Sequence, residues 1–429
     1  MAGQLTERID ALIEADTPRL VEVFKDLHRH PELGFAEVRT ARIVAQTLAD
    51  LGFTVTTGIG RTGVVATLDN GPGPMVMYRA DMDALAVEED TGLDYASTAR
   101  VRRDGPDSGT EVPVGHMCGH DAHVTWMLGM AKVLAQTTDA WSGTALLIGQ
   151  PAEELIAGAR AMVDDGLYDV VGKPDSFVAL HTAPVPVGLV AAGGGERMAG
   201  TDQLDIVFHG VGGHGSMPEL ARDPVLMASL AVVQFQSIVS RAIAPHETAV
   251  LTVGAMQAGA AYNVIPAQAL LKVNLRWFNA YVREQLLAGI RSISDGVARS
   301  YGMPDDLMPT ITMAGGSTPL VNDTVLTDRL AGALGGLLGA DNVVTQLPAV
   351  AGSEDCHLLK GPHTDIPLAY LFVGVADPQV YSDGAAAGRL FPYSPHSPDF
   401  VVDPAAIPFG VKVAGHAMLE LLGTGNFPL

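Results

Sequence analysis

Several short apolar runs in the first half of this chain end in acidic or imidazole side chains and lead toward helical segments. The runs are PMVMYRADMDAL, WSGTALLIG and DSFVAL, and the polar residues at their ends are Asp81 with Asp83, Glu153 with Glu154, and His181. Alternating strands and helices imply a largely parallel sheet, whose ligands bind beyond the carboxyl ends of the strands. We therefore expect an α/β protein in which these polar side chains gather at one edge of the sheet.

A thiol and several imidazoles occur together in HMCGHDAH, residues 116–123. Such side chains are ligands of soft-to-borderline divalent metals. Cys118 and His120 would point to opposite faces of a regular strand, so they can share an ion only in a loop. Gly119, with Asp121 as the N-cap of the next helix, supplies that loop. An isolated Cys-Gly-His is better explained by a buried cysteine beside a core histidine, but the polar strand ends elsewhere favour a metal site.

Four further histidines lie in or near these motifs. His28 and His30 precede Pro31, and we expect them at an exposed helix end rather than on a metal. His116 and His123 are expected to lie near the site without binding metal.

The composition limits the classes of protein to which the chain can belong. Its 429 residues are enough for two or three domains, and 48% apolar residues are typical of a globular core. A formal net charge of −22 argues against binding to nucleic acid or an anionic membrane. The N-terminus lacks the basic and apolar segments of a signal peptide, and no apolar run approaches the roughly 18 residues of a membrane span. We expect a cytoplasmic protein.

The two cysteines, Cys118 and Cys356, lie far apart in the sequence. They could form a disulfide only in an oxidising compartment, so a reduced thiol that can bind metal is expected. This expectation agrees with a cytoplasmic location.

The pattern changes from about residue 197. A strand, a helix, two strands, a second helix and a final strand follow in the order β-α-β-β-α-β. This is a self-contained α+β unit that resembles a ferredoxin-like domain. Strand-helix alternation then resumes, so we expect a discontinuous catalytic domain of residues 1–196 and 317–429 with residues 197–316 inserted.

Eight motifs carry a resemblance to a known family. In chain order they are HRHPELGFAE, RADMDAL, HMCGHDAH, QPAEE, GGHGSMP, AYNVIPAQALLKVNLR, GSED and HSPDF. Their order and separations resemble the metal-dependent aminoacylase, hippurate hydrolase and auxin-conjugate amidohydrolase family. The resemblance implies a zinc-peptidase-like catalytic domain and an inserted lid and dimerisation domain. It also implies hydrolysis of the amide bond of N-acyl amino acids by a homodimer or higher homo-oligomer.

Position by position, the resemblance implies five metal ligands and two divalent ions per subunit. The implied ligands are Cys118, His120, Glu154, His181 and His396. Their mixture of thiolate, imidazole and carboxylate suits zinc, manganese or cobalt better than magnesium or calcium.

The resemblance also assigns Glu153 as the general base. Two adjacent carboxylates project in different directions, so Glu154 can hold metal while Glu153 faces the attacking water. A divalent ion lowers the pKa of water from 15.7 toward roughly 7 and polarises the amide carbonyl. Glu153 can take the proton and return it to the departing amine, a role typically worth about 10²–10⁴ in rate. An isolated Glu pair would instead be explained as acidic side chains at the start of a helix, where they interact favourably with the helix dipole.

Four more residues receive roles from the resemblance. Asp83 is expected to orient a ligand histidine. His214 in GVGGHGS resembles a histidine that stabilises the developing oxyanion from the lid of a second subunit. Asn263 and Arg276 resemble residues that hold the polar end of the substrate, and the forked guanidinium of Arg276 suits a carboxylate.

The sequence departs from the family pattern at three positions. Glu219 stands where a second histidine is common, Ala86 where a proline is common, and Cys356 where an aromatic residue is common. These differences bear on the preference for the acyl group and the amino acid rather than on hydrolysis itself.

Three alternatives remain open from the sequence. The first is a dipeptidase or carboxypeptidase on the same fold, which would differ in its pocket residues. The second is a metal- or ligand-binding protein on a hydrolase scaffold that has lost catalysis, against which the intact Glu153 argues. The third is a cysteine hydrolase built on Cys118. It would assign no function to the glutamate pair, Glu153 and Glu154, or to His181 and His396.

Overall fold

The computed structural model describes residues 2–102 and 109–423 of the chain. These residues form two compact units, each with its own apolar core. The large unit comprises Met1–Gly195, Val321–Pro348 and Asp355–Leu429, and the inserted unit comprises Glu196–Leu320 and Ala349–Glu354. The sequence pattern does not predict that Ala349–Glu354 belongs to the inserted unit.

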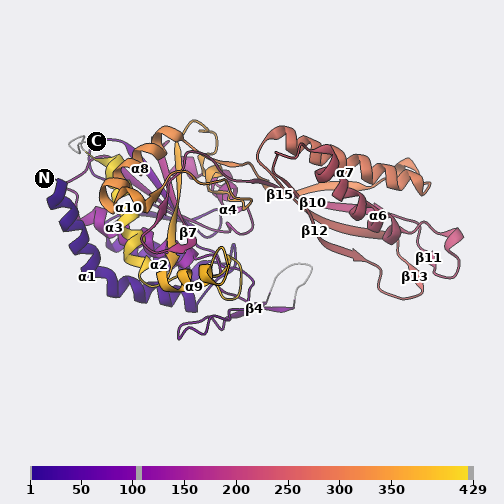
Figure 1. Ribbon diagram of the computed structural model, residues 1–429, viewed down its shortest axis with the longest axis horizontal. Helices are drawn as coiled ribbons and strands as arrows, with labels where there is room; N and C mark the ends of the chain where they lie inside the picture. The colour runs from indigo at the N-terminus through magenta and orange to yellow at the C-terminus, as the bar shows by residue number, and fades with distance from the viewer. Residues whose placement is uncertain (1, 103–108, 424–429) are drawn as a thin grey trace. The chain divides into compact units, whose positions relative to one another are not determined.

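The large unit is built on one eight-stranded sheet (Figure 1). In spatial order its strands are β1 (Thr54–Ile59), β2 (Gly63–Asp69), β6 (Thr144–Gln150), β3 (Met75–Asp81), β7 (Ser176–Pro186), β18 (Leu368–Ala376), β8 (Val190–Ala191) and β17 (Val343–Val344). The central strands β6, β3, β7 and β18 run parallel to one another. They are buried almost throughout, as is usual for parallel strands covered by helices. The predicted α/β fold with a mostly parallel central sheet is confirmed.

Three long helices pack against one another beside this sheet (Figure 1). They are α1 (Ala2–Arg29), α3 (His120–Gln136) and α10 (Ala406–Leu422). The indole N–H of Trp126 in α3 donates to the carbonyl of Ala406 at 3.0 Å. A Cβ on Gly410 would lie 2.2 Å from that indole ring, so only glycine allows the two helices to approach this closely. This packing fixes α3, and with it the loop that precedes its first residue.

The shorter elements of the large unit lie around this frame. They are α2 (Val38–Asp50), β4 (Arg100–Arg102), β5 (Glu111–Pro113), α4 (Gly158–Asp164), α5 (Leu167–Val170), α8 (Thr324–Leu338) and α9 (Pro378–Ala386).

The parallel strands bring the polar motifs to one edge. β3 ends at Asp81 and β6 ends at Gln150, and the register of the sheet pairs these two residues. β7 runs parallel to β3 and carries His181, which pairs with Phe372 of β18. The residues that follow β3 and β6 therefore emerge side by side, as the sequence predicts.

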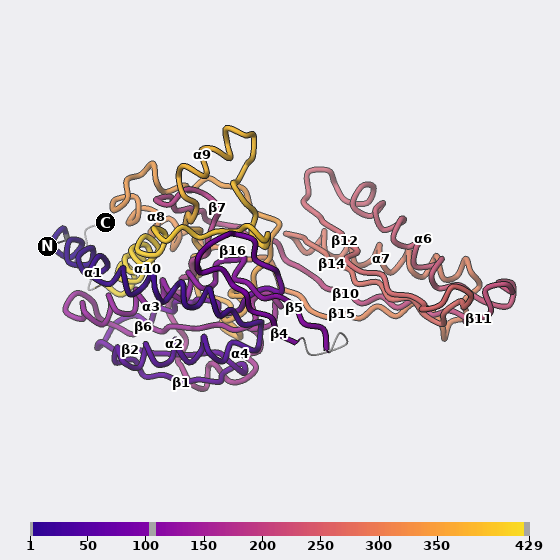
Figure 2. Tube along the Cα trace, turned by 90° about the horizontal axis from the view of Figure 1, so that it is seen from below, coloured from indigo at the N-terminus to yellow at the C-terminus, as the bar shows by residue number. Residues whose placement is uncertain are grey.

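The inserted unit has the order β10 (Gly200–His209), α6 (Pro224–Ser237), β12 (Ala249–Ala258), β14 (Gln268–Trp277), α7 (Ala280–Ser300) and β15 (Thr310–Ser317). Its antiparallel sheet has the spatial order β12-β14-β10-β15. Alternate residues of β10, Leu204, Ile206 and Phe208, enter its core. This is the predicted ferredoxin-like arrangement. A short ribbon of β11 (Gly213–His214) and β13 (Val264–Ile265) extends beyond one end of the sheet (Figure 1), where Figure 2 also shows β11.

One helical segment, Pro224–Ala242, is long and apolar enough to cross a membrane by length and composition alone, with a mean hydropathy of 1.4. The expectation that no segment would reach this length was therefore wrong. Met227, Ala231 and Phe235 on this segment are buried in the core of the inserted unit. A core helix of a globular protein passes the same test.

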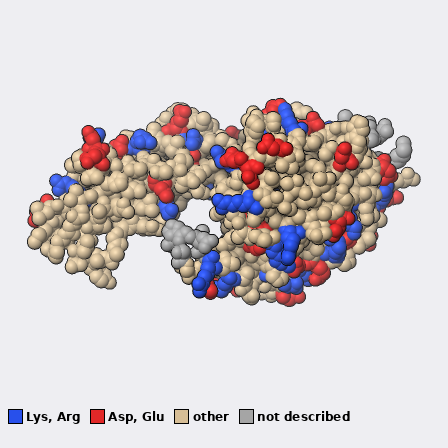
Figure 3. All heavy atoms as spheres, turned by 180° about the vertical axis from the view of Figure 1, so that it is seen from behind, with Lys and Arg blue, Asp and Glu red and all other residues tan. Residues whose placement is uncertain are grey.

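Acidic and basic side chains are interspersed on the face that Figure 3 shows. The formal net charge of the chain is −22.

Candidate metal centre and active site

Five side chains with metal-binding atoms form one connected cluster at the carboxyl edge of the large sheet. They are Cys118, His120, Glu154, His181 and His396. Sγ of Cys118 lies 3.6 Å from Nε2 of His181. Oε1 of Glu154 lies 3.3 Å from Nε2 of His396 and 3.8 Å from Nε2 of His120. The structure thus brings together the five residues that the sequence motifs single out as ligands.

Each of these side chains comes from a different place in the fold. Cys118 lies in the loop before α3, His120 is the first residue of α3, Glu154 follows β6, His181 lies in β7, and His396 lies in the loop before α10. His396 has a left-handed backbone, with φ of 66°, and its N–H donates to the carbonyl of Met117 at 2.7 Å. This hydrogen bond ties two segments far apart in the sequence to one site.

The start of α3 differs from the prediction. The helix begins at His120 with Gly119 as its N-cap, so the prediction that Asp121 caps it was wrong. Gly119 has a φ of 82°, and a Cβ there would lie 2.6 Å from Cγ2 of Thr182. Asp121 lies inside the helix, and its carboxylate binds His28, with 2.7 Å between Oδ2 and Nδ1.

Two of the histidines have one ring nitrogen held by the protein. Nδ1 of His181 lies 2.8 Å from the carbonyl oxygen of Thr182, so it carries the proton and donates. Nδ1 of His120 lies 3.2 Å from Oδ1 of Asp83. In both rings Nε2 is left to face the cluster, which is the usual arrangement of metal-binding histidines.

Two buried atoms of the cluster support the fit of a cation. Within the described residues, Nε2 of His120 and Oε1 of Glu154 have no hydrogen-bond partner, although Asp81 faces the first at 3.4 Å and His396 faces the second at 3.3 Å. Buried polar atoms without partners are costly in a folded protein. The charge of the cluster agrees, because the neighbouring Cys118 and Glu154 raise the pKa of His396 to about 10. A divalent cation would supply the positive charge for which this histidine otherwise holds a proton.

The thiol of Cys118 has a lowered pKa. Burial and the neighbouring carboxylate of Glu154 raise its pKa, but His181 and His120 outweigh them and lower that pKa to about 6. The thiolate, which is the form that binds metal, therefore predominates at neutral pH.

His123 and His116 lie beside the cluster. Nδ1 of His123 lies 2.5 Å from Oδ1 of Asp81, and its Nε2 accepts the N–H of Thr182 at 2.9 Å. With both ring nitrogens engaged, His123 has no lone pair for a metal. His116 is buried, and burial lowers its pKa to about 4.

The two histidines that end α1 differ from each other. His30 is exposed, as predicted, and its Nδ1 lies 2.8 Å from the carbonyl oxygen of Asp26. The prediction of an exposed position was wrong for His28, which is 3% exposed. It lies between the carboxylates of Asp121 and Glu89, the latter at 3.1 Å, and these two partners allow the imidazole to be buried.

Asp83 touches both the cluster and the glutamate pair. Its Oδ1 faces His120, and its Oδ2 accepts the backbone N–H of Glu154 at 2.9 Å. Burial raises the pKa of this carboxyl. Glu153 is 5% exposed. Its Oε2 lies 4.0 Å from Nε2 of His120.

A buried polar network beneath the cluster was not predicted. Arg79 is fully buried, and its guanidinium donates to Asp81 and to Gln150, each at 2.8 Å. Nε2 of Gln150 in turn donates to Asp355 at 2.5 Å. The signal available in the sequence was a charged pair, Arg79 and Asp81, inside an apolar strand buried on both faces.

His214, Asn263 and Arg276 belong to the inserted unit. His214 and Asn263 are neighbours at the β11-β13 ribbon, where the N–H of Gly215 donates to the carbonyl of Asn263 at 2.8 Å. Nδ1 of His214 accepts the N–H of Ser216 at 3.1 Å. Arg276 lies near the far end of β14, where its Nε donates to Asn274 at 2.8 Å.

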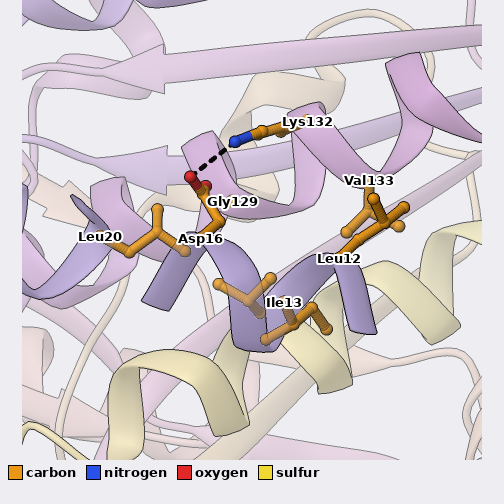
Figure 4. Close-up of a pocket in the computed structure, with 8 residues that line it drawn as sticks. Leu12, Ile13, Asp16, Leu20, Gly129, Lys132 and Val133 are labelled. Carbon is orange, nitrogen blue, oxygen red and sulfur yellow. Dashed lines mark hydrogen bonds and ion pairs between the residues drawn. The ribbon is translucent and has the colours of Figure 1, made fainter. Parts of the chain in front are cut away.

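A separate pocket lies between α1 and α3 (Figure 4). Leu12, Ile13 and Leu20 line it from α1. Its charged groups, Asp16 and Lys132, pair with each other at 2.6 Å.

Comparison with known proteins identifies the family. The model of the family described as "Peptidase family M20/M25/M40" matches residues 77–419. The chain is 31% identical over 391 residues to the N-acetyl-L-cysteine deacetylase of Bacillus subtilis, which covers 91% of this chain and 85% of that protein. It is 40% identical over 278 residues to the hippurate hydrolase of Campylobacter jejuni, covering 64% and 68%.

A solved structure agrees with these relatives. The YXEP protein of Bacillus subtilis, described as a dinuclear metal-binding peptidase of the M20 family, superposes with a TM-score of 0.72 at 26% identity. The alignment covers 95% of this chain and 99% of that one. The resemblance inferred from the motifs is thereby confirmed, and the chain belongs to peptidase family M20/M25/M40.

Proposed function

We propose that the chain is a metal-dependent amidohydrolase that cleaves the amide bond of N-acyl amino acids. The observation that carries this proposal is the position of Glu153, a buried carboxylate beside a cluster of thiolate, imidazole and carboxylate donors. A protein that only binds metal has no use for such a base. The names of the two relatives, one a deacetylase and one a hippurate hydrolase, support this substrate class.

The metal ligands that we propose are the five residues of the cluster, Cys118, His120, Glu154, His181 and His396. Their number and softness suit two ions of zinc, manganese or cobalt. The description of the YXEP protein as dinuclear supports two ions. When bound, such an ion lowers the pKa of water and polarises the amide carbonyl.

Glu153 is the general base in this proposal. Its carboxylate takes a proton from water as the water oxygen bonds to the carbonyl carbon. It then gives that proton to the amide nitrogen as the C–N bond breaks, so that a carboxylic acid and a free amino acid leave. Asp83 holds the backbone next to this base and the ring of His120, which keeps both in position.

Residues of the inserted unit bind the substrate in this proposal. Because Nδ1 of His214 accepts a hydrogen bond from Ser216, the neutral ring carries its proton on Nε2. That N–H can donate to the oxygen on which charge develops. Asn263 and the forked guanidinium of Arg276 suit the polar end of the substrate, including its carboxylate.

The spacing of these residues supports a homodimer. Asn263 precedes β14, and Arg276 lies near the end of that strand. At about 3.3 Å per residue, the first residue of β14 and Arg276 are roughly 26 Å apart. One small substrate can touch both Asn263 and Arg276 only if they come from two copies of the chain. Leu226 and Val233 on α6 are 47% and 71% exposed and offer an apolar surface for such an assembly.

We further propose that the enzyme works in the cytoplasm without nucleic-acid or membrane partners. Cys118 and Cys356 are both buried, and a thiol at Cys118 that can bind metal suits a reducing compartment. The strongly negative net charge opposes binding to phosphate backbones.

A substrate panel tests the proposed function. Protein stripped by chelator is refilled with zinc, manganese or cobalt and given N-acetyl, N-benzoyl and long-chain N-acyl amino acids, while release of the free amino acid is measured. We expect turnover on at least one member, lost on stripping and restored by metal. Dipeptides are assayed in parallel. Cleavage of dipeptides alone would make the chain a dipeptidase, and stoichiometric metal binding with no turnover on either class would refute the proposal.

A further inference from the structure

The turn that carries Glu153 has an unusual backbone. Ala152 and Ile156, on either side of the glutamate pair, adopt the left-handed region with φ of 48° and 54°. Residues with a Cβ rarely adopt this conformation, which persists only where surrounding contacts hold it. The direction of the Glu153 side chain therefore depends on the groups that hold this turn.

Two buried carboxylates hold the turn on either side of Glu153. The N–H of the residue before it, Ala152, donates to Oε1 of Glu37 at 2.8 Å. The N–H of the residue after it, Glu154, donates to Oδ2 of Asp83 at 2.9 Å. The base thus lies between two anchored peptide groups, and each depends on a residue far away in the sequence.

Glu37 is itself held in place. Its side chain is fully buried, and its Oε1 also accepts the N–H of Phe35 at 2.9 Å. Its Oε2 accepts the hydroxyl of Thr62 at 2.5 Å. The segment before it lies against the turn, because a Cβ on Gly34 would sit 3.1 Å from Cα of Ala152.

Helix capping does not explain this carboxylate. Glu37 immediately precedes α2, but its side chain makes no capping hydrogen bond to that helix. The N–H groups of Arg39 and Thr40 donate instead to the carboxylate of Glu32, at 2.9 and 2.8 Å. Glu32 therefore stabilises the helix, and Glu37 is directed at the turn.

We propose that Glu37 is a positioning residue for Glu153, and that its hydrogen bond to the Ala152 N–H sets the direction of the base. This inference rests on the proposed function, in which Glu153 is the base. Glu37 itself touches neither the substrate nor the transferred proton.

Substitution of Glu37 tests the inference. Glu37→Met removes all three hydrogen bonds at similar volume, and we expect kcat to fall about 10- to 100-fold with KM changed by less than about threefold. Glu37→Gln keeps an acceptor for the two N–H groups and a donor for Thr62, so we expect it to restore kcat to within about threefold of wild type. Metal content stays at the wild-type value in both variants.

Glu32→Met is the matched control. It removes a carboxylate of the same segment that binds backbone N–H groups of α2, so it lowers the melting temperature and leaves kcat near the wild-type value. A kcat for Glu37→Met equal to that of Glu32→Met would overturn the inference. A Gln variant as slow as the Met variant would also overturn it, because the effect would then come from charge.

Two further measurements keep the inference testable. Hydrogen exchange at the Ala152 N–H should speed up in Glu37→Met and not in Glu32→Met, and this readout requires no activity. If Glu37→Met does not fold, Thr62→Val takes its place, since it frees one carboxylate oxygen. We expect its kcat to fall by about threefold or more, and an unchanged value would overturn the inference. Wild-type protein that hydrolyses no member of the panel would refute the proposed function instead.

Discussion

The carboxylate of Asp83 accepts the backbone N–H of Glu154 at 2.9 Å, while its other oxygen lies 3.2 Å from Nδ1 of His120. One buried side chain thus orients two of the proposed ligands, which come from different elements of the fold. Groups that orient ligands in this way affect metal affinity without touching the metal.

Asp83→Asn should weaken metal binding by about 10- to 100-fold, because an amide cannot accept from both partners with the strength of a carboxylate. Titration of stripped protein with zinc, followed by calorimetry, measures the effect. Asp139→Asn, which alters an exposed carboxylate paired with Arg8, serves as the control and should bind zinc as wild type does. Equal affinities for the two variants would contradict the role of Asp83.

Cys118→Ala should lose bound metal, because it removes the one thiolate of the cluster, whose Sγ lies 3.6 Å from Nε2 of His181. Metal content after dialysis, measured by elemental analysis, tests this. Cys356→Ala removes the other buried cysteine and should keep its metal. Full metal content in Cys118→Ala would show that the ligand set is wrong.

Glu153→Gln should lower kcat by about 10²–10⁴ and leave the metal content unchanged, because an amide cannot take up the proton. Steady-state kinetics on the best substrate of the panel, with metal analysis of the same preparation, checks both parts. An amidohydrolase that keeps near-full activity in this variant must use another base.

Stability should fall as the pH rises through about 9, because of His28. Burial lowers the pKa of this histidine, but hydrogen bonds to Asp121 and Glu89 outweigh burial and raise it to about 9. The folded state therefore binds the proton more tightly than the unfolded chain, whose histidines have a pKa near 6.5. The contribution is complete below about pH 6.5 and disappears as the pH passes through the folded value.

Urea unfolding of wild type and His28→Gln at several pH values between 6 and 10 measures this contribution. The difference in unfolding free energy should amount to a few kcal/mol at pH 6, because each tenfold gain in proton affinity on folding contributes about 1.4 kcal/mol. This difference should shrink toward pH 10. A difference that stays constant over this range would mean that His28 is not charged in the folded protein.

Mixing two inactive variants should restore activity if one substrate meets residues of two chains. His214→Ala and Arg276→Ala each remove a proposed substrate contact. In a mixed two-fold dimer one of the two sites regains both residues, so random exchange of subunits should recover about a quarter of the wild-type activity. Size-exclusion chromatography establishes the dimer, and two variants that stay inactive after exchange would show that both residues serve the same chain.

The sequence by itself determined the α/β fold, the ferredoxin-like insert and the kind of chemistry at the strand ends. These follow from local patterns, because apolar runs and turns mark strands, and parallel strands end at one edge of a sheet. Only the tertiary structure decided which distant groups meet. Glu37 binds Ala152, 115 positions away, and His28 binds Asp121, 93 positions away. Both side chains are buried, so each needs a hydrogen-bond partner inside the protein. A local sequence pattern cannot predict such pairs, because they depend on how helices and loops pack against the sheet.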